Sequence, residues 1–211
     1  MVAVTSIVAR SADLGIVENR SFLLSDFRLQ SGTVLPELKI LYETYGRLGN
    51  DRNGLLITYG YTGSYHASGG NPANGNQPGW WDGLIGPGCA IDTDKRFVVS
   101  SNMLGSSFGS TNSASINPAT GKPYGPDFSA ITVRDVVMVE KALLDSFGVK
   151  HLIAVAGPSY GGYQPFQWAV TGPDFRGGIV PVVSAPRAQD VEKNPAELEA
   201  RLAAQRVARL P

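Results

Sequence analysis

The sequence predicts an α/β protein in which helices cover both faces of a mostly parallel sheet. Short apolar runs alternate with segments of helical period along the second half of the chain, as in βαβ units. Two loosely alternating segments, 22–29 and 38–45, are separated by the turn residues Ser31 and Gly32. This pattern is typical of an antiparallel hairpin, which we expect at one edge of the sheet. The first 20 residues show no period and predict a loose arm.

Two further apolar runs, 55–59 and 96–100, predict buried strands, and a long loop comes after each of them. The first loop, 60–78, is rich in Gly and Asn, and the second spans about residues 105–129. Loops of this length in compact domains usually carry function.

A helix is predicted to begin at Thr132, because Thr132 and Asp135 have the spacing of a capping box. We expect it to end at Gly148, in a left-handed cap. A later strand is predicted over 179–184, although Pro181 fits an edge strand better than a central one.

A nucleophile elbow is predicted at residues 157–161, Gly-Pro-Ser-Tyr-Gly, which match the pattern Gly-x-Ser-x-Gly. An apolar strand over 152–156 precedes this turn, and an apolar helix over 163–170 follows it. The two glycines allow neighbouring elements to approach a serine held in a strained backbone conformation. Ser159 is therefore the predicted nucleophile. Together with the hairpin and the parallel strands, it favours an α/β-hydrolase fold.

The same pattern occurs a second time at residues 105–109, with Ser107 at its centre. The run after it is polar, has no helical period and ends at Pro118, so it predicts a loop. We therefore expect Ser107 to have no catalytic role.

An acyl-transferring serine needs hydrogen-bond donors for the oxyanion that forms on its substrate. In this fold one donor is the amide after the serine, here Tyr160, and the other lies on the loop after an earlier strand. That loop begins at Gly60, and we expect the Tyr61 amide to be the second donor.

The composition excludes several classes of function. Eighteen basic and 18 acidic residues cancel, which gives no indication of a nucleic-acid or membrane partner. Cys89 is the single cysteine, so neither a disulfide framework nor a zinc cluster is predicted. The first thirty residues contain charges and no long apolar run, which predicts a cytoplasmic protein.

Six blocks of the sequence resemble the homoserine O-acetyltransferase family. The match covers most of residues 22–184, and the blocks follow in order: 41–46 (Leu-Tyr-Glu-Thr-Tyr-Gly), 62–66 (Thr-Gly-Ser-Tyr-His), 78–82 (Pro-Gly-Trp-Trp-Asp), 86–94 (Gly-Pro-Gly-Cys-Ala-Ile-Asp-Thr-Asp), 102–106 (Asn-Met-Leu-Gly-Ser) and the elbow 157–164.

This resemblance implies that Ser159 accepts an acetyl group from acetyl-CoA, a co-substrate, and passes it to an amino-acid hydroxyl, without a bound cofactor or metal. It also implies that the amides of Tyr61 and Tyr160 form the oxyanion hole, that Thr62 lies beside the acceptor, and that the protein forms a homodimer. Because similar proteins insert a lid over the site, we assign residues 1–185 to part of the α/β core. Residues 186–211, with a helix predicted from Asn194, are assigned to the start of the lid.

The elbow departs from the family's usual Gly-Gly-Ser-Met-Gly-Gly-Met at Pro158, Tyr160 and Tyr163. The aromatic residues are similar to those of family relatives that act as esterases. A carboxylesterase that forms the same acyl-enzyme is therefore one alternative. A non-catalytic α/β binding domain is another.

The catalytic base is not evident among the two histidines. His151 begins the elbow strand and so lies roughly 25 Å from Ser159. His66 lies on the oxyanion loop, but in this fold the base comes after the serine, so we expect His66 to be a loop or pocket residue. No histidine follows Ser159. Asp174 and Asp190 follow Ser159, but neither can orient a catalytic base when no imidazole is present. We therefore expect the 211 residues to be an incomplete enzyme.

Overall fold

The structure, a computed structural model, describes residues 14, 17–49 and 53–186. The predicted arm, except for a few residues near its end, and the predicted helix at Asn194 lie outside the described residues. The assignment of 186–211 to a lid therefore stays a prediction.

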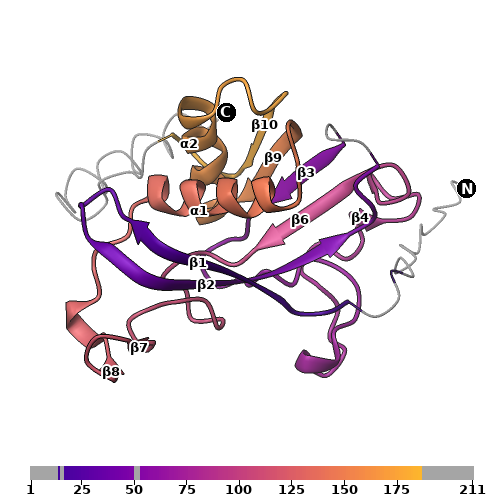
Figure 1. Cartoon of the computed structure of the whole chain (residues 1–211). Coiled ribbons are helices and arrows are strands. Elements are labelled where there is room, and N and C mark those ends of the chain that lie inside the picture. Colours follow the sequence, from indigo (N-terminus) through magenta and orange to yellow (C-terminus); the bar gives the residue numbers. More distant parts are fainter. Residues whose placement is uncertain (1–13, 15–16, 50–52, 187–211) are drawn as a thin grey trace, which may run out of the picture.

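A six-stranded mixed sheet in the order β1-β2-β6-β3-β9-β10 forms the centre of the described part (Figure 1). Its strands are β1 (Arg20–Arg28), β2 (Val34–Tyr45), β3 (Gly54–Ile57), β6 (Phe97–Ser101), β9 (Leu152–Pro158) and β10 (Ile179–Val182). Strands β1, β2 and β6 pair antiparallel, whereas β6, β3, β9 and β10 pair parallel. The mostly parallel sheet and its N-terminal hairpin at the sheet edge are thereby confirmed.

Two α-helices and several short elements complete the described part. The helices are α1 (Val133–Ser146) and α2 (Tyr163–Thr171). The short elements are η1 (Pro72–Asn74), β4 (Ile85–Gly86), β5 (Ile91–Asp92), β7 (Ile116–Asn117), β8 (Lys122–Pro123), η2 (Gly125–Asp127) and η3 (Ser159–Gly162).

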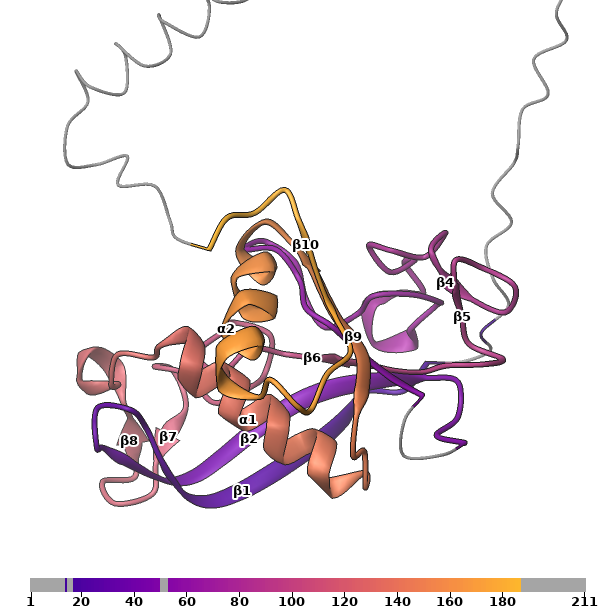
Figure 2. The same ribbon diagram turned by 90° about the horizontal axis from the view of Figure 1, so that it is seen from above.

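Helices α1 and α2 lie side by side against one face of the sheet (Figures 1 and 2). One core cluster joins Leu56, Val99 and Val155 of the sheet to Val137 of α1 and Trp168 of α2. The helix-covered face is therefore built from alternate residues of three parallel strands.

The opposite face is covered by loops. The sequence neighbours of Leu56, Val99 and Val155 on this face are Ile57, Val98 and Ala156. They pack with Ala67 and Ile85 of the segment between β3 and β6. The prediction of helices on both faces is thus wrong for the described residues. A segment rich in Gly and Asn has too few apolar positions for an amphipathic helix, so it covers the face as an irregular loop.

Strands β3 and β10 both end earlier than the sequence predicts. The chain leaves β3 after Ile57, although the Thr58 amide still donates to the Ala156 carbonyl at 2.9 Å. Strand β10 ends at Val182, because Val183 has a φ of +49°. Within the described sheet β10 is an edge strand, which accounts for the tolerance of Pro181.

The capping box at the start of α1 also ties the helix to the hairpin turn. The Thr132 amide donates to Asp135 Oδ2 at 2.9 Å, and the Asp135 amide donates to Thr132 Oγ1 at 3.2 Å. The other oxygen, Asp135 Oδ1, accepts from the Gln30 amide at 2.6 Å. Asp135 is only 3% exposed, so its carboxylate, in place of water, accepts hydrogen bonds from the backbone amides of two distant segments.

Replacing Asp135 by Ala should lower the free energy of unfolding by about 2 kcal/mol, since a cap and a buried acceptor are lost together. Denaturant unfolding measures this change. The matched control is Asp145→Ala in the last turn of the same helix, where an exposed ion pair with Lys141 is lost. It should cost less than about 0.5 kcal/mol. Equal costs for the two variants would contradict the role assigned to Asp135.

A buried carboxyl group, Glu140, lies where α1, α2 and β6 meet. Trp168 Nε1 donates to Glu140 Oε2 at 2.8 Å, and Ser101 Oγ lies 3.4 Å from Oε1. Burial raises the pKa of Glu140 to about 8, and the two donors offset only part of this effect. In the folded protein the Glu140 carboxyl is therefore mostly protonated, and so uncharged, near neutral pH.

The raised pKa of Glu140 predicts a defined pH dependence. Because the folded state keeps the proton that the unfolded state loses near pH 4.5, stability should fall as the pH rises from about 5 to about 8. Glu140→Gln, which keeps an acceptor for Trp168, should remove this slope in unfolding experiments. The exposed control Glu37→Gln should retain it. A slope unchanged in Glu140→Gln would refute the explanation.

Candidate active site

The carboxyl ends of β3, β6 and β9 meet at one edge of the sheet, because these three strands are parallel. From β3 the chain proceeds to β6 on one side, and from β6 it returns through α1 to β9 on the other side of β3. Ligands of open α/β sheets bind at such reversals of strand order. The loops that follow these three strands therefore define the candidate site.

The turn after β9 has the geometry of a nucleophile elbow. Ser159 has a φ of +52°, which non-glycine residues seldom adopt, and it is exposed. A Cβ on Gly157 would lie 1.9 Å from Thr58 Oγ1, and one on Gly161 would lie 2.4 Å from the Tyr59 carbonyl oxygen. Both glycines of the motif are therefore required by the close approach of the end of β3.

The loop after β3 turns in front of Ser159. An ideal Cβ on Gly60 would lie 3.6 Å from the Ser159 Cβ, and the Gly63 amide closes a turn on the Gly60 carbonyl at 2.9 Å. The rings of Tyr61 and Tyr160 are in edge-to-face contact, with centroids 5.8 Å apart. The structure thus brings together Ser159, Tyr61 and Tyr160, although they come from two loops about a hundred residues apart.

The Tyr160 amide belongs to the first turn of a helical segment, η3, which continues directly into α2. Amides in a first turn have no intrahelical acceptor, and the helix dipole places partial positive charge at that end. An anion that forms beside Ser159 would therefore face a polar environment that favours negative charge.

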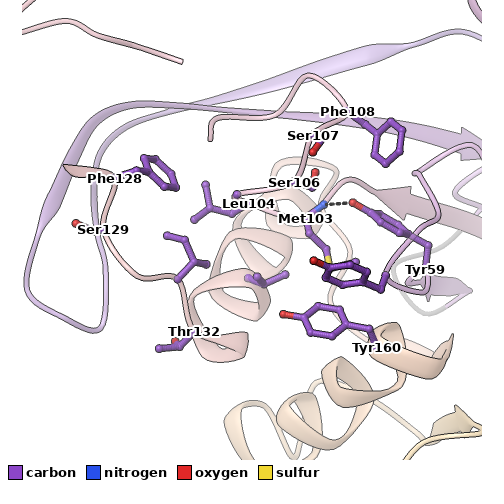
Figure 3. A pocket seen from close by; sticks show the side chains of 14 residues that line it. Tyr59, Met103, Leu104, Ser106, Ser107, Phe108, Phe128, Ser129, Thr132 and Tyr160 are labelled. Carbon is purple, nitrogen blue, oxygen red and sulfur yellow. Dashed lines mark hydrogen bonds between the residues drawn. The ribbon is translucent and has the colours of Figure 1, made fainter. Parts of the chain in front are cut away.

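A cavity of about 420 Å³ adjoins Tyr61 and Tyr160 (Figure 3). Figure 3 shows Ser106, Ser107 and Phe108 on one side of the cavity and Tyr160 on the other. Its wall is mostly apolar, and it is lined by Tyr59, Tyr61, Met103, Leu104, Gly105, Ser106, Ser107, Phe108, Phe128, Ser129, Ile131, Thr132, Val136 and Tyr160. The second long loop therefore contributes much of this wall.

The second Gly-x-Ser-x-Gly match lies in this wall and lacks the elbow geometry. Ser107 has no left-handed φ, and no α-helix begins after it until Val133. The strain that marks Ser159 is thus absent at Ser107, as the polar run that follows it predicts.

Thr62, the predicted neighbour of the acceptor, is exposed and does not line the cavity. Residues that do line it, such as Phe128 and Ile131, were not predicted individually. The length of the loop before Thr132 was the signal that could have indicated them.

His66 is held by two acceptors and is not placed as a base. Its Nδ1 lies 3.0 Å from Glu43 Oε2, and its Nε2 lies 2.9 Å from the Gln77 carbonyl oxygen. A base needs a ring nitrogen that is free to accept a proton, and here each nitrogen faces an oxygen. The geometry therefore argues against His66 as the partner of Ser159.

The same buried network fixes the first long loop to β2. Glu43 is fully buried, and it accepts from Tyr45 Oη and from Asn71 Nδ2, both at 2.6 Å. Burial and the neighbouring Glu43 raise the pKa of the Tyr45 phenol, so its hydroxyl remains a donor. The Tyr45 oxygen in turn accepts from the Ala67 amide at 2.9 Å. His66 thus belongs to the support of the loop.

His151 directly precedes β9, and Ser159 follows the other end of the strand. The Nδ1 atom of His151 lies 3.2 Å from the Asp174 carbonyl oxygen.

Among the described residues there is no group of three or more His, Cys, Asp or Glu side chains that could hold a metal ion. No helix in this part of the chain is long and apolar enough to span a bilayer.

The strand order, the left-handed serine and the helix behind it define an α/β-hydrolase-fold protein with a nucleophile elbow. The chain matches no family model. It is 46% identical to the homoserine O-acetyltransferase of Deferribacter desulfuricans over 176 residues, which cover 82% of this chain and 47% of that protein. The chain is thus a homologue of homoserine O-acetyltransferases, and it spans about half the length of the curated relatives that it matches.

Solved structures with the same arrangement include both transferases and esterases. The homoserine O-acetyltransferase from Bacillus anthracis superposes with a TM-score of 0.79 at 35% identity, covering 84% of this chain and 49% of that one. Esterase E22 superposes with a TM-score of 0.71 at 42% identity, covering 76% and 45%. The fold prediction agrees with both structures.

The close approach at the elbow predicts a difference between two glycines. Gly157→Ala should destabilise the protein by more than about 2 kcal/mol, because its Cβ would overlap the Thr58 side chain and backbone oxygens. Gly60→Ala is the control, since its Cβ would make only ordinary contacts, at 3.6 Å and beyond, and it should change stability by less than about 1 kcal/mol. Thermal unfolding compares the two. A tolerated Gly157→Ala would contradict the described packing.

Proposed function

We propose that this protein is a serine-dependent acyltransferase that moves an acetyl-type group from an acyl-CoA to an amino-acid hydroxyl through an acyl-enzyme on Ser159. The observation that carries this proposal is the left-handed φ of Ser159 at the start of a helix, directly opposite the Gly60 turn. The homoserine O-acetyltransferases among its relatives support the choice of substrates.

In this proposal the Ser159 oxygen gives its proton to a base and attacks the thioester carbonyl, and the amides of Tyr61 and Tyr160 stabilise the oxyanion. The C–S bond then breaks, the CoA thiol leaves with a proton, and the acceptor hydroxyl takes the acyl group in a second attack that restores the Ser159 hydroxyl. Donors of this kind are effective because they are already oriented before charge develops. Thr62 is proposed as a contact for the acceptor, which would approach from the exposed side of the turn. The apolar cavity beside Tyr160 would hold part of a substrate.

Activation of Ser159 needs a base that takes the proton of its hydroxyl. Neither histidine of the sequence is placed for this role, since His66 is held between two acceptors and His151 lies at the far end of β9. A serine hydroxyl without a base is a poor nucleophile.

A carboxylesterase is the second candidate, because esterase E22 is a structural neighbour at 42% identity. Both reactions share the acyl-enzyme and differ in whether water or an amino-acid hydroxyl resolves it. Acetyl-CoA as co-substrate, a role in methionine biosynthesis, a cytoplasmic location and a homodimer rest on the family resemblance, and they form part of the proposal for the transferase.

The test does not depend on the base, because it makes the nucleophile a thiol. Cysteine is intrinsically far more nucleophilic than serine, so Ser159→Cys in a Cys89→Ser background should acylate with p-nitrophenyl acetate or acetyl-CoA. Intact mass should show one acetyl group, and peptide mapping should place it at position 159. The matched control is Ser107→Cys in the same background, which should react at least about tenfold more slowly because it lacks oxyanion donors.

Equal acylation of the two thiols would contradict the proposed site. With the acyl-enzyme in hand, addition of homoserine separates the two candidate functions. Release of O-acetylhomoserine supports the transferase, whereas release of acetate alone at the same rate with and without homoserine supports the esterase.

A further inference from the structure

Helix α2 contains a proline at a position where it removes a backbone hydrogen bond behind the nucleophile. Pro165 is the third residue of α2, and it is buried. Without an N–H it cannot donate to the carbonyl four residues back, which belongs to Gly161 of the elbow. Gly161 is itself buried, so its carbonyl needs another strong donor.

The hydroxyl of Thr58 supplies that donor from a different strand. Thr58 Oγ1 donates to the Gly161 carbonyl oxygen at 2.8 Å, and it also lies 3.3 Å from the Ala156 carbonyl oxygen. The Tyr163 amide is shared between the carbonyls of Tyr160 and Gly161, so it compensates only in part. Thr58 is 1% exposed, which leaves water little access to these groups.

The position of Thr58 relative to the elbow is also fixed by Gly157, two residues before Ser159. The Thr58 hydroxyl fills the space where a Cβ of Gly157 would lie, at 1.9 Å from it. The Thr58 amide meanwhile donates to Ala156 at 2.9 Å. The side chain is therefore enclosed between the strand that leads to Ser159 and the turn that follows it.

We propose that Thr58 is a positioning residue for the nucleophile: its hydroxyl replaces the amide that Pro165 removes and so holds the turn that carries Ser159 and the Tyr160 amide. This inference rests on the proposed function. Thr58 does not touch the reacting atoms in this account. It acts through the Gly161 carbonyl, one residue after the amide that faces the oxyanion.

A double-mutant cycle tests whether Thr58 and Pro165 are coupled in this way. The parent is the Ser159→Cys, Cys89→Ser protein, and the variants are Thr58→Ala, Pro165→Ala and both together. Thr58→Ser serves as the control that keeps the hydroxyl but removes the methyl group. The readouts are the rate constant for thiol acylation by p-nitrophenyl acetate and the midpoint of denaturant unfolding.

Thr58→Ala should slow acylation about tenfold and lower the unfolding midpoint, because a buried carbonyl loses its main donor. Thr58→Ser and Pro165→Ala should each stay within about twofold of the parent rate. In the Pro165→Ala background the helix amide is restored, so adding Thr58→Ala should slow acylation by no more than about threefold.

Equal losses from Thr58→Ala with and without Pro165→Ala would overturn the inference, and so would a Thr58→Ser variant as slow as Thr58→Ala. Failure of the proposed function is distinguishable, because the parent itself would then not acylate at position 159. In that case the unfolding midpoints still test the exchange of donors. A smaller decrease of the midpoint by Thr58→Ala in the Pro165→Ala background than in the parent supports it, and an equal decrease refutes it.

Discussion

The close approach of the end of β3 to the turn after β9 is the constraint on which the candidate site depends. Two backbones pass so near one another that a side chain would fit at neither Gly157 nor Gly161. This proximity places the Gly60 turn opposite Ser159. The strained conformation of Ser159 persists because packing on both sides over-determines it.

The first long loop, between β3 and β6, is held by buried polar contacts as well as by apolar packing. Fully buried Glu43 receives hydrogen bonds or an ion pair from Tyr45, His66 and Asn71. Removing any one partner of such a group is costly, because a buried polar atom is then left without a hydrogen bond. The network therefore holds a glycine-rich segment against β2 and keeps its first turn, at Gly60, in register with the elbow.

The parts of the site that were predictable from the sequence are those encoded locally. The elbow needs a strand, a small-residue turn and a helix within about twenty residues, and the capping box of α1 needs only Thr132 and Asp135. The identity of the loop that faces Ser159 followed from its place after the first parallel strand. Each of these features is confirmed by the described geometry, whereas the catalytic roles stay predictions.

What the sequence did not reveal depends on contacts between distant residues. The Thr58–Gly161 hydrogen bond joins residues about a hundred positions apart, and its significance appears only when Pro165 is seen to lack an N–H. His66 was considered as a loop or pocket residue, and its pairing with Glu43 could not be inferred from spacing. The segment 60–78 is a loop as predicted, but its packing over one face of the sheet, where helices were expected, depends on contacts that no sequence pattern reveals.

Backbone amides, in particular that of Tyr160, are proposed to stabilise the oxyanion at this site. The direct measurement replaces Tyr160 by its α-hydroxy acid in the Ser159→Cys protein, which exchanges a single N–H for an oxygen and keeps the side chain. The acylation rate should fall on the order of 100-fold, as for the loss of one oxyanion donor, whereas Tyr160→Phe should leave it nearly unchanged. An unchanged rate after removal of the N–H, or an equal loss in Tyr160→Phe, would contradict the account.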